Sequence, residues 1–108
     1  NSDLTGTEWS PFYGFYSAQT RQLKDGMPPG GWYPEEAVTA EEALRAYTVW
    51  PARSSGIESR TGTVEAEKWA DLTVLDLDPL NVPADSLLSG SVRMTVVGGV
   101  VRFELADL

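Results

Sequence analysis

Carboxylates are the most numerous ionisable groups in this chain. The sequence contains 16 Asp and Glu residues, but no histidine and no cysteine. Ser-His-Asp and Cys-His catalysis are therefore excluded, as are thiolate sites and zinc sites of the usual imidazole type. Any chemistry that this chain does alone must use carboxylates, hydroxyls, lysines or aromatic rings.

One group of acidic residues resembles a calcium loop. Asp76, Asp78 and Asn81 have suitable spacing, but the glycine of the sharp turn and the distal bidentate glutamate are missing. The residues Asp78-Pro79 are typical of a turn after a strand. The pattern therefore favours a strand end and a turn over a metal site.

Two pairs of adjacent glutamates could suggest acid–base catalysis. Glu35 precedes Glu36, and Glu41 precedes Glu42. Adjacent residues do not face one another on a helix, so neither pair has the geometry of a glycosidase. Glu41 and Glu42 are explained by a helix start, where negative charge is favourable.

Two other candidates are a lysine and a set of aromatic side chains. Lys68 would be a nucleophile only if burial lowered its pKa, and beside Glu67 we expect it to be exposed.

The aromatic side chains could form a sugar-stacking surface, although packing in a core or an interface is favoured. The set comprises Trp9, Tyr13, Tyr16, Trp32 and Tyr33.

Size and charge narrow the possible partners. The chain has 108 residues and a net charge of −8, with a pI near 4.3. This length suits one domain. An acidic surface disfavours both nucleic acid and anionic membranes as partners.

No apolar run reaches the roughly 18 residues of a membrane helix. No signal peptide is visible, which favours a cytoplasmic location. The absence of an initial methionine suggests that the chain begins inside a longer gene product or follows a removed segment.

Helices are expected in the first half of the chain. Residues 11–23 form an apolar face after Pro11, which suits a first helical position. A capping box at Thr39 and Glu42 begins a second helix, which Pro51 should stop before a short helical turn ending near Gly56. Its apolar stripe consists of Ala43, Leu44, Tyr47 and Trp50.

Strands are expected in the second half. Residues 72–77, 92–97 and 100–104 have strand composition, and Gly98-Gly99 indicates a hairpin. Residues 63–65 suggest a fourth, short strand. The chain thus divides into a helical and loop segment, 1–56, and a β-rich segment, 57–108, within one compact unit. The predicted fold class is α+β, with N-terminal helices packed on a small, mainly antiparallel sheet.

Several short motifs along the chain are together typical of one enzyme family. Residues 62–76, GTVEAEKWADLTVLD, are similar to the signature that closes many amidohydrolases, and residues 95–101 resemble its final hairpin. Ser2-Asp3 resembles the dipeptide that ends the last barrel strand. Residues 18–21 and 32–36 are most similar to the branch called amidohydrolase family 3, a family of metal-dependent hydrolases. The resemblance covers about residues 2 to 104.

The resemblance implies that the chain is the C-terminal part of a larger enzyme. Such an enzyme is a (β/α)8 barrel with a small β-sandwich, and its divalent metal, such as zinc, is held by histidines. It hydrolyses amide or related C–N bonds. Only Asp3 matches a residue of the family's active site, where it would act as a ligand or proton shuttle. Because histidine is absent, we expect this chain to hold no metal or other cofactor and to be inactive alone.

The sequence departs from the family pattern in three places. Thr5 replaces a common proline, and Pro51 replaces a small or flexible residue. Glu67 stands in place of a turn glycine, where a positive φ costs about 1 kcal/mol. These changes suggest relaxed constraint on the segment.

A chain with this part of the sandwich alone would leave a sheet edge and an apolar face open. We therefore expect a homo-oligomer, formed through the open sheet edge or the exposed apolar face. An alternative function of another class is a stand-alone oligomeric interaction module or a module that binds aromatic ligands.

Overall fold

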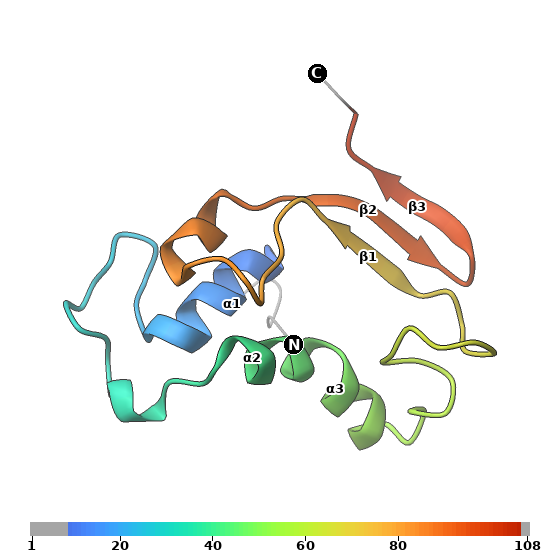
Figure 1. Ribbon diagram of the computed structural model, residues 1–108, viewed down its shortest axis with the longest axis horizontal. Helices are drawn as coiled ribbons and strands as arrows, with labels where there is room; N and C mark the ends of the chain where they lie inside the picture. The colour runs from blue at the N-terminus through green and yellow to red at the C-terminus, as the bar shows by residue number, and fades with distance from the viewer. Residues whose placement is uncertain (1–8, 107–108) are drawn as a thin grey trace.

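The computed structural model describes residues 9–106 and has an α+β fold (Figure 1). Helices come first in the chain and three antiparallel strands come last. The elements in order are α1 (Pro11–Thr20), the 3-10 helix η1 (Pro34–Glu36), α2 (Ala40–Tyr47), α3 (Val49–Ser54), β1 (Leu72–Leu75), the 3-10 helix η2 (Ala84–Ser89), β2 (Val92–Val97) and β3 (Val100–Glu104). No helix within 9–106 is both long enough and apolar enough to cross a membrane.

Helix α1 begins at Pro11 as predicted, but it ends three residues before the predicted boundary at 23. Arg21 adopts a left-handed conformation with φ 58°. The hydroxyl of Thr20 donates to the carbonyl of Tyr16 and accepts the N–H of Gln22. These local side-chain bonds replace the next helical bonds. Leu23 consequently lies outside the helix and is exposed.

Helix α2 has the predicted capping box. The Thr39 hydroxyl accepts the Glu42 N–H, and the Glu42 carboxylate accepts the Thr39 N–H at 2.8 Å. The prediction that Pro51 stops this helix is wrong, because α2 ends at Tyr47 and Pro51 lies inside α3. A break at Thr48 places Pro51 within the first turn of a new helix, where its missing N–H costs nothing. The break leaves Trp50 exposed, outside the predicted apolar stripe.

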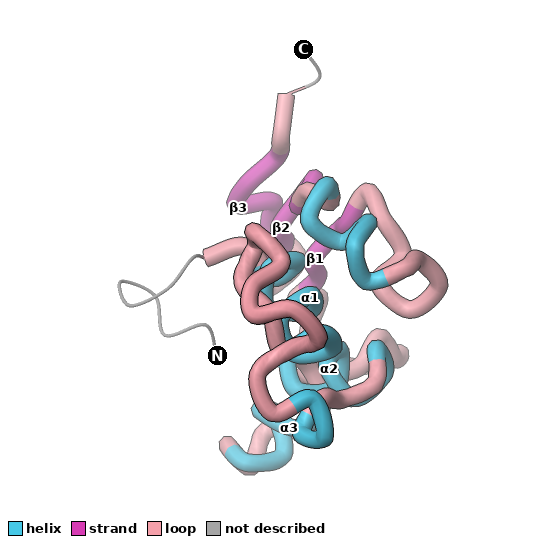
Figure 2. Tube along the Cα trace, turned by 90° about the vertical axis from the view of Figure 1, so that its left-hand side faces the viewer, coloured by secondary structure: helices cyan, strands magenta, loops and turns pink. Residues whose placement is uncertain are grey.

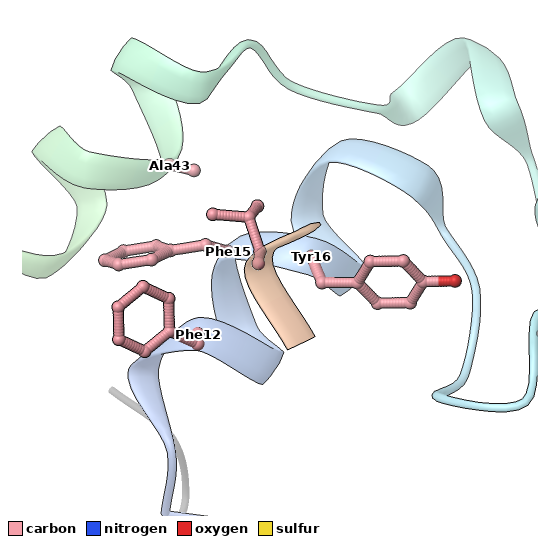
Figure 3. Packing of buried hydrophobic residues seen from close by; sticks show 5 residues of the cluster. Phe12, Phe15, Tyr16 and Ala43 are labelled. Carbon is pink, nitrogen blue, oxygen red and sulfur yellow. The ribbon is translucent and has the colours of Figure 1, made fainter. Parts of the chain in front are cut away.

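The buried core lies among α1, α2 and η2. It consists of Phe12, Phe15, Tyr16, Ala43 and Leu87 (Figure 3). The rings of Phe12 and Phe15 meet edge to face at 6.1 Å, and Phe15 meets Tyr47 in the same way at 5.0 Å. Leu87 arrives from the second half of the sequence and is fully buried. The core therefore joins both segments of the chain.

The sheet has the order β1-β2-β3, and its hairpin is the predicted one. Gly98 and Gly99 have φ values of 58° and 78°, as a type I′ turn requires. Strand β1 ends at Leu75, before the predicted boundary at 77, after an irregularity in its pairing with β2. The strand predicted at 63–65 is absent from the described structure, because that segment forms irregular turns.

The helices do not pack on the sheet as predicted. In both views the strands extend away from α2 and α3 (Figure 1, Figure 2), and α1 packs instead on η2 and α2. Only Leu75, at the end of β1, and Leu77 beyond it reach the core from this region. No residue of the three strands is buried, even in the central strand β2. The sheet therefore gains little from the hydrophobic core of its own chain.

Leu87→Ala tests the importance of the junction between the two segments. We expect it to lower the free energy of unfolding by about 2–5 kcal/mol, because it leaves a cavity in a fully packed site. Leu88→Ala is the matched control, since Leu88 is 37% exposed and should lose far less. Urea denaturation followed by circular dichroism measures both. Equal losses at the two positions would contradict the assigned core.

Candidate functional site

The structure explains the acidic residues near the end of β1 as parts of a turn. Asp76 accepts the N–H of Ser91 at 2.7 Å. Asp78 accepts Asn81 Nδ2 at 2.6 Å and the N–H of Leu80 at 2.9 Å. The bond from Asn81, followed by that from Leu80, lowers the pKa of Asp78. This is the predicted strand end and turn.

Of the four paired glutamates, Glu41 and Glu42 contact nearby residues, whereas Glu35 and Glu36 are exposed. Glu42 accepts bonds from Thr39, chiefly from its backbone, and these lower the pKa of Glu42. Glu41 forms an ion pair with Arg45 at 2.7 Å. Glu35 and Glu36 lie in η1 and are exposed. None of these pairs forms an acid–base site.

Lys68 is more buried than predicted, with only 16% of its side chain exposed. Its ammonium group donates to the Glu58 carbonyl at 2.8 Å and to the Thr63 hydroxyl at 2.6 Å, and it pairs with Glu65 at 3.0 Å. Lys68 therefore ties together the irregular segment 57–71. An ammonium group held by three acceptors is a structural tie and not a free nucleophile.

The backbone of the segment 57–71 restricts which residue types fit at two of its positions. Glu67 has φ 71°, which confirms the prediction of a positive φ at this departure from the family pattern. Gly62 has φ 97°, and a Cβ there would lie 2.7 Å from the Ala52 Cβ. A side chain at 62 would therefore be both strained and crowded against α3.

The five aromatic residues that could form a stacking surface are not assembled into one. Tyr16 is buried in the core, whereas Trp9 is 79% exposed. Trp32 and Tyr33 meet edge to face at 4.8 Å, and the Arg21 guanidinium lies 5.4 Å from the centre of the Trp32 ring. Tyr13 instead contacts Lys24. The set divides into a core residue and separate surface contacts.

A cavity of about 510 Å³ lies between the helices and β1. Its lining includes the aromatic residues Phe15 and Tyr47 and several threonines. Among the lining residues within 9–106, Asp71 is the one carboxylate, and it accepts the N–H of Gly98 at 2.7 Å. The sequence analysis did not single out Asp71, although it belongs to the Ala70-Asp71 pair of the closing motif. A single carboxylate that anchors the hairpin cannot supply an acid–base pair.

The described residues do not fit a catalytic metal. Within 9–106 there is no group of three or more Asp, Glu, His or Cys side chains that could hold an ion. Asp3, the candidate catalytic residue, lies outside the described residues. The contacts described above hold the backbone of residues 9–106 together as a framework.

Comparison with known protein families agrees with this framework. A model of the amidohydrolase family, its branch 3, matches residues 1–103. The chain belongs to amidohydrolase family 3. The matched range includes the closing motif with Gly62, Lys68 and Asp71.

Individual amidohydrolases share this segment. An N-substituted formamide deformylase from Arthrobacter pascens is 44% identical over 103 residues, which are 95% of this chain and 18% of that protein. An imidazolonepropionase from Picrophilus torridus is 35% identical over 63 residues, 58% of this chain and 16% of that protein. A crystal structure of an amidohydrolase from Thermotoga maritima superposes with a TM-score of 0.55 and 30% identity over 66% of this chain and 17% of that chain. The amidohydrolase segment spans less than a fifth of each protein.

We expect low pH to destabilise the segment 57–71, because the Glu65 carboxylate becomes protonated. Bonds from Lys68 and then Thr63 lower the pKa of Glu65 below its usual 4.5. A lowered pKa in the folded state stabilises the segment above about pH 4.5, and this stabilisation is lost as pH falls through the lowered value. We expect the protection of the Trp69 amide, which donates to Arg60, to fall in this range in hydrogen exchange.

Two variants isolate this effect. Glu65→Gln should remove much of the acid dependence, and Lys68→Met should lower Trp69 protection several-fold at neutral pH. Glu35→Gln is the control, because Glu35 is exposed in η1 and shows no hydrogen bond within residues 9–106. An unchanged acid profile in Glu65→Gln would contradict the assigned role of the Lys68 tie.

Proposed function

We propose that this chain is the C-terminal scaffold of a metal-dependent amidohydrolase and has no catalytic activity by itself. The observation that carries the proposal is the family match over residues 1–103 in a sequence that contains no histidine. The chain thus has the family's closing motifs without the side chains that the family uses to hold its metal. In the complete enzyme the metal would activate water for attack on a C–N bond.

The chain would contribute positioning to that reaction. Its first residues would end the last strand of the barrel, and Asp3 would project into the active site as a ligand or proton shuttle. Its three strands would form part of a β-sandwich beside the barrel. Two contacts support this role. Lys68 holds the irregular segment together, and Asp71 anchors that segment to the hairpin at Gly98.

The substrate class follows from the relative that aligns over most of the chain. That protein is a deformylase of N-substituted formamides and is 44% identical over 103 residues. We therefore propose that the complete enzyme cleaves the C–N bond of an amide of this type. The similarity to an imidazolonepropionase makes a cyclic amide the alternative substrate.

The isolated chain should not hydrolyse an N-substituted formamide. We expect no turnover above the uncatalysed rate with or without added zinc, because the chain lacks the histidine ligands. Release of formate measures turnover, and calorimetric titration with zinc should show no submicromolar binding. Hydrolysis that a chelator abolishes would refute the proposal of an inert scaffold.

A chimera tests the scaffold role and Asp3 together. The aligned residues of the Arthrobacter deformylase are replaced by this chain, and we expect the chimera to retain deformylase activity. Asp3→Asn in the chimera should lower kcat by about a hundredfold or more, as expected for loss of a proton-transfer group. Asp85→Asn is the control, because Asp85 is exposed on η2 and should not affect kcat. Full activity of the Asp3→Asn chimera would rule out the role of Asp3.

A second candidate function is a stand-alone interaction module. The incomplete burial of the sheet favours it, because no residue of even the central strand β2 is buried and such a sheet requires a partner surface for stability. This candidate predicts association of the isolated chain.

A further inference from the structure

The pairing of β1 with β2 changes its register near the end of β1. Val74 lies opposite Met94, but the next residue, Leu75, lies opposite Val92. Arg93 is therefore the extra residue of β2 at this β-bulge. An uninterrupted antiparallel ladder would place Arg93 opposite Leu75.

The bulge decides which side chain accompanies Leu75. Residues directly opposite each other in an antiparallel pair have their side chains on the same face of the sheet. Leu75 packs against the buried core cluster, so the residue opposite it lies on the face next to the core. The bulge gives this position to the apolar Val92, whereas a regular ladder would bring the charge of Arg93 there, which is unfavourable beside an apolar core.

Burial of apolar side chains specifies this register only weakly. No residue of β1 or β2 is buried. A slip of one residue is strongly resisted where one face of a strand is buried, and weakly resisted where both faces are accessible. The shifted register at Leu75 therefore depends on contacts other than core packing.

Asp76 makes two such contacts, both with Ser91. Its N–H donates to the Ser91 carbonyl at 3.2 Å, and its carboxylate accepts the Ser91 N–H at 2.7 Å. A hydrogen-bonded antiparallel pair exchanges two bonds between backbones, and here the carboxylate takes the place of the Asp76 carbonyl. Asp76 and Ser91 continue the register of Leu75 and Val92. A regular ladder would place Asp76 opposite Val92 and break both bonds.

The other end of β1 is fixed against the hairpin turn. The Asp71 carboxylate accepts the Gly98 N–H, and the Gly99 N–H donates to the Ala70 carbonyl at 3.0 Å. Loss of the bulge at this end would require several residues of β1 to move past β2 and would break these bonds. Loss at the other end moves Leu75 alone within the strand, and the bonds of Asp76 oppose it.

We propose that Asp76 is a positioning residue that holds the bulge at Arg93 and thereby selects Val92 as the residue opposite Leu75. The last residue of the closing motif, residues 62–76, then sets the register of the strand that it follows. This proposal does not depend on the amidohydrolase reaction.

Nuclear magnetic resonance tests the register directly. Cross-strand nuclear Overhauser contacts between backbone protons show which residue lies opposite Leu75, and in the natural chain we expect Val92. In Asp76→Ala we expect these contacts to be replaced by contacts from Leu75 to Arg93. Protection of the Ser91 amide from hydrogen exchange should fall about tenfold, as expected for the loss of one hydrogen bond.

Two further variants separate the bond from the charge. Asp76→Asn keeps an oxygen acceptor, so Val92 should stay opposite Leu75, while Ser91 protection should fall about threefold because a neutral acceptor is weaker than a carboxylate. Asp78→Ala is the matched control, since it removes the same charge two residues later, where the carboxylate bonds to Leu80 and Asn81 within the turn. It should change neither the register nor the protection of Ser91.

Three results would overturn the proposal. The first is an Asp76→Ala chain that keeps Val92 opposite Leu75 with full protection of Ser91. The second is an equal loss in Asp78→Ala, and the third is contact between Leu75 and Arg93 in the natural chain. If circular dichroism shows that Asp76→Ala is unfolded, Asp76→Asn takes its place, and unchanged Ser91 protection in that variant would overturn the proposal.

Discussion

The packing of Leu87 against the aromatic face of α1 holds the two segments of this chain together. Leu87 lies on the short helix η2, far along the sequence from Phe12 and Phe15, yet all three belong to one buried cluster. The C-terminal end of η2 lies so close to α1 that a Cβ at Gly90 would be 2.6 Å from the Phe12 Cδ1. Because η2 connects β1 to β2, the position of the sheet depends on this contact.

The sheet itself receives little support from the rest of the chain. Its strands are joined by backbone pairing and by a two-glycine turn, and Asp71 anchors that turn to the start of β1. Apolar side chains on all three strands remain accessible, including Val74, Val97 and Val101. Burial of apolar area is the main favourable term in folding, so a sheet of this kind gains most of its stability from a covering surface. This property suits a scaffold that completes a larger assembly.

Membership of the amidohydrolase family is compatible, for a physical reason, with the absence from residues 9–106 of a group of three side chains that could hold a metal. The closing motif of the family serves to position backbone: Gly62 allows close approach to Ala52, Glu67 adopts a positive φ, and Lys68 satisfies acceptors from three residues. None of these functions requires a reactive side chain. A segment can therefore keep the architectural motifs of an enzyme while the metal ligands belong to other parts of the family fold.

Local features of this protein could be predicted from the sequence because their causes are local. The capping box at Thr39 depends on two side chains three residues apart, and the Gly98-Gly99 turn depends on the positive φ that glycine permits. The absence of histidine likewise excludes imidazole chemistry in this chain, because no fold can supply a side chain that the sequence lacks.

Tertiary structure decided the features that depend on distant residues. The helix boundaries at Arg21 and Thr48 are an exception, because their causes are the nearby Thr20 hydroxyl and the fit of Pro51 in a first turn, which apolar periodicity does not reveal. The burial of Lys68 depends on carbonyl and hydroxyl groups up to ten residues away. The placement of the helices against η2, with the sheet left uncovered, depends on which apolar surfaces fit together in space. An apolar pattern identifies a face that must be covered, but only the packed chain shows which surface covers it.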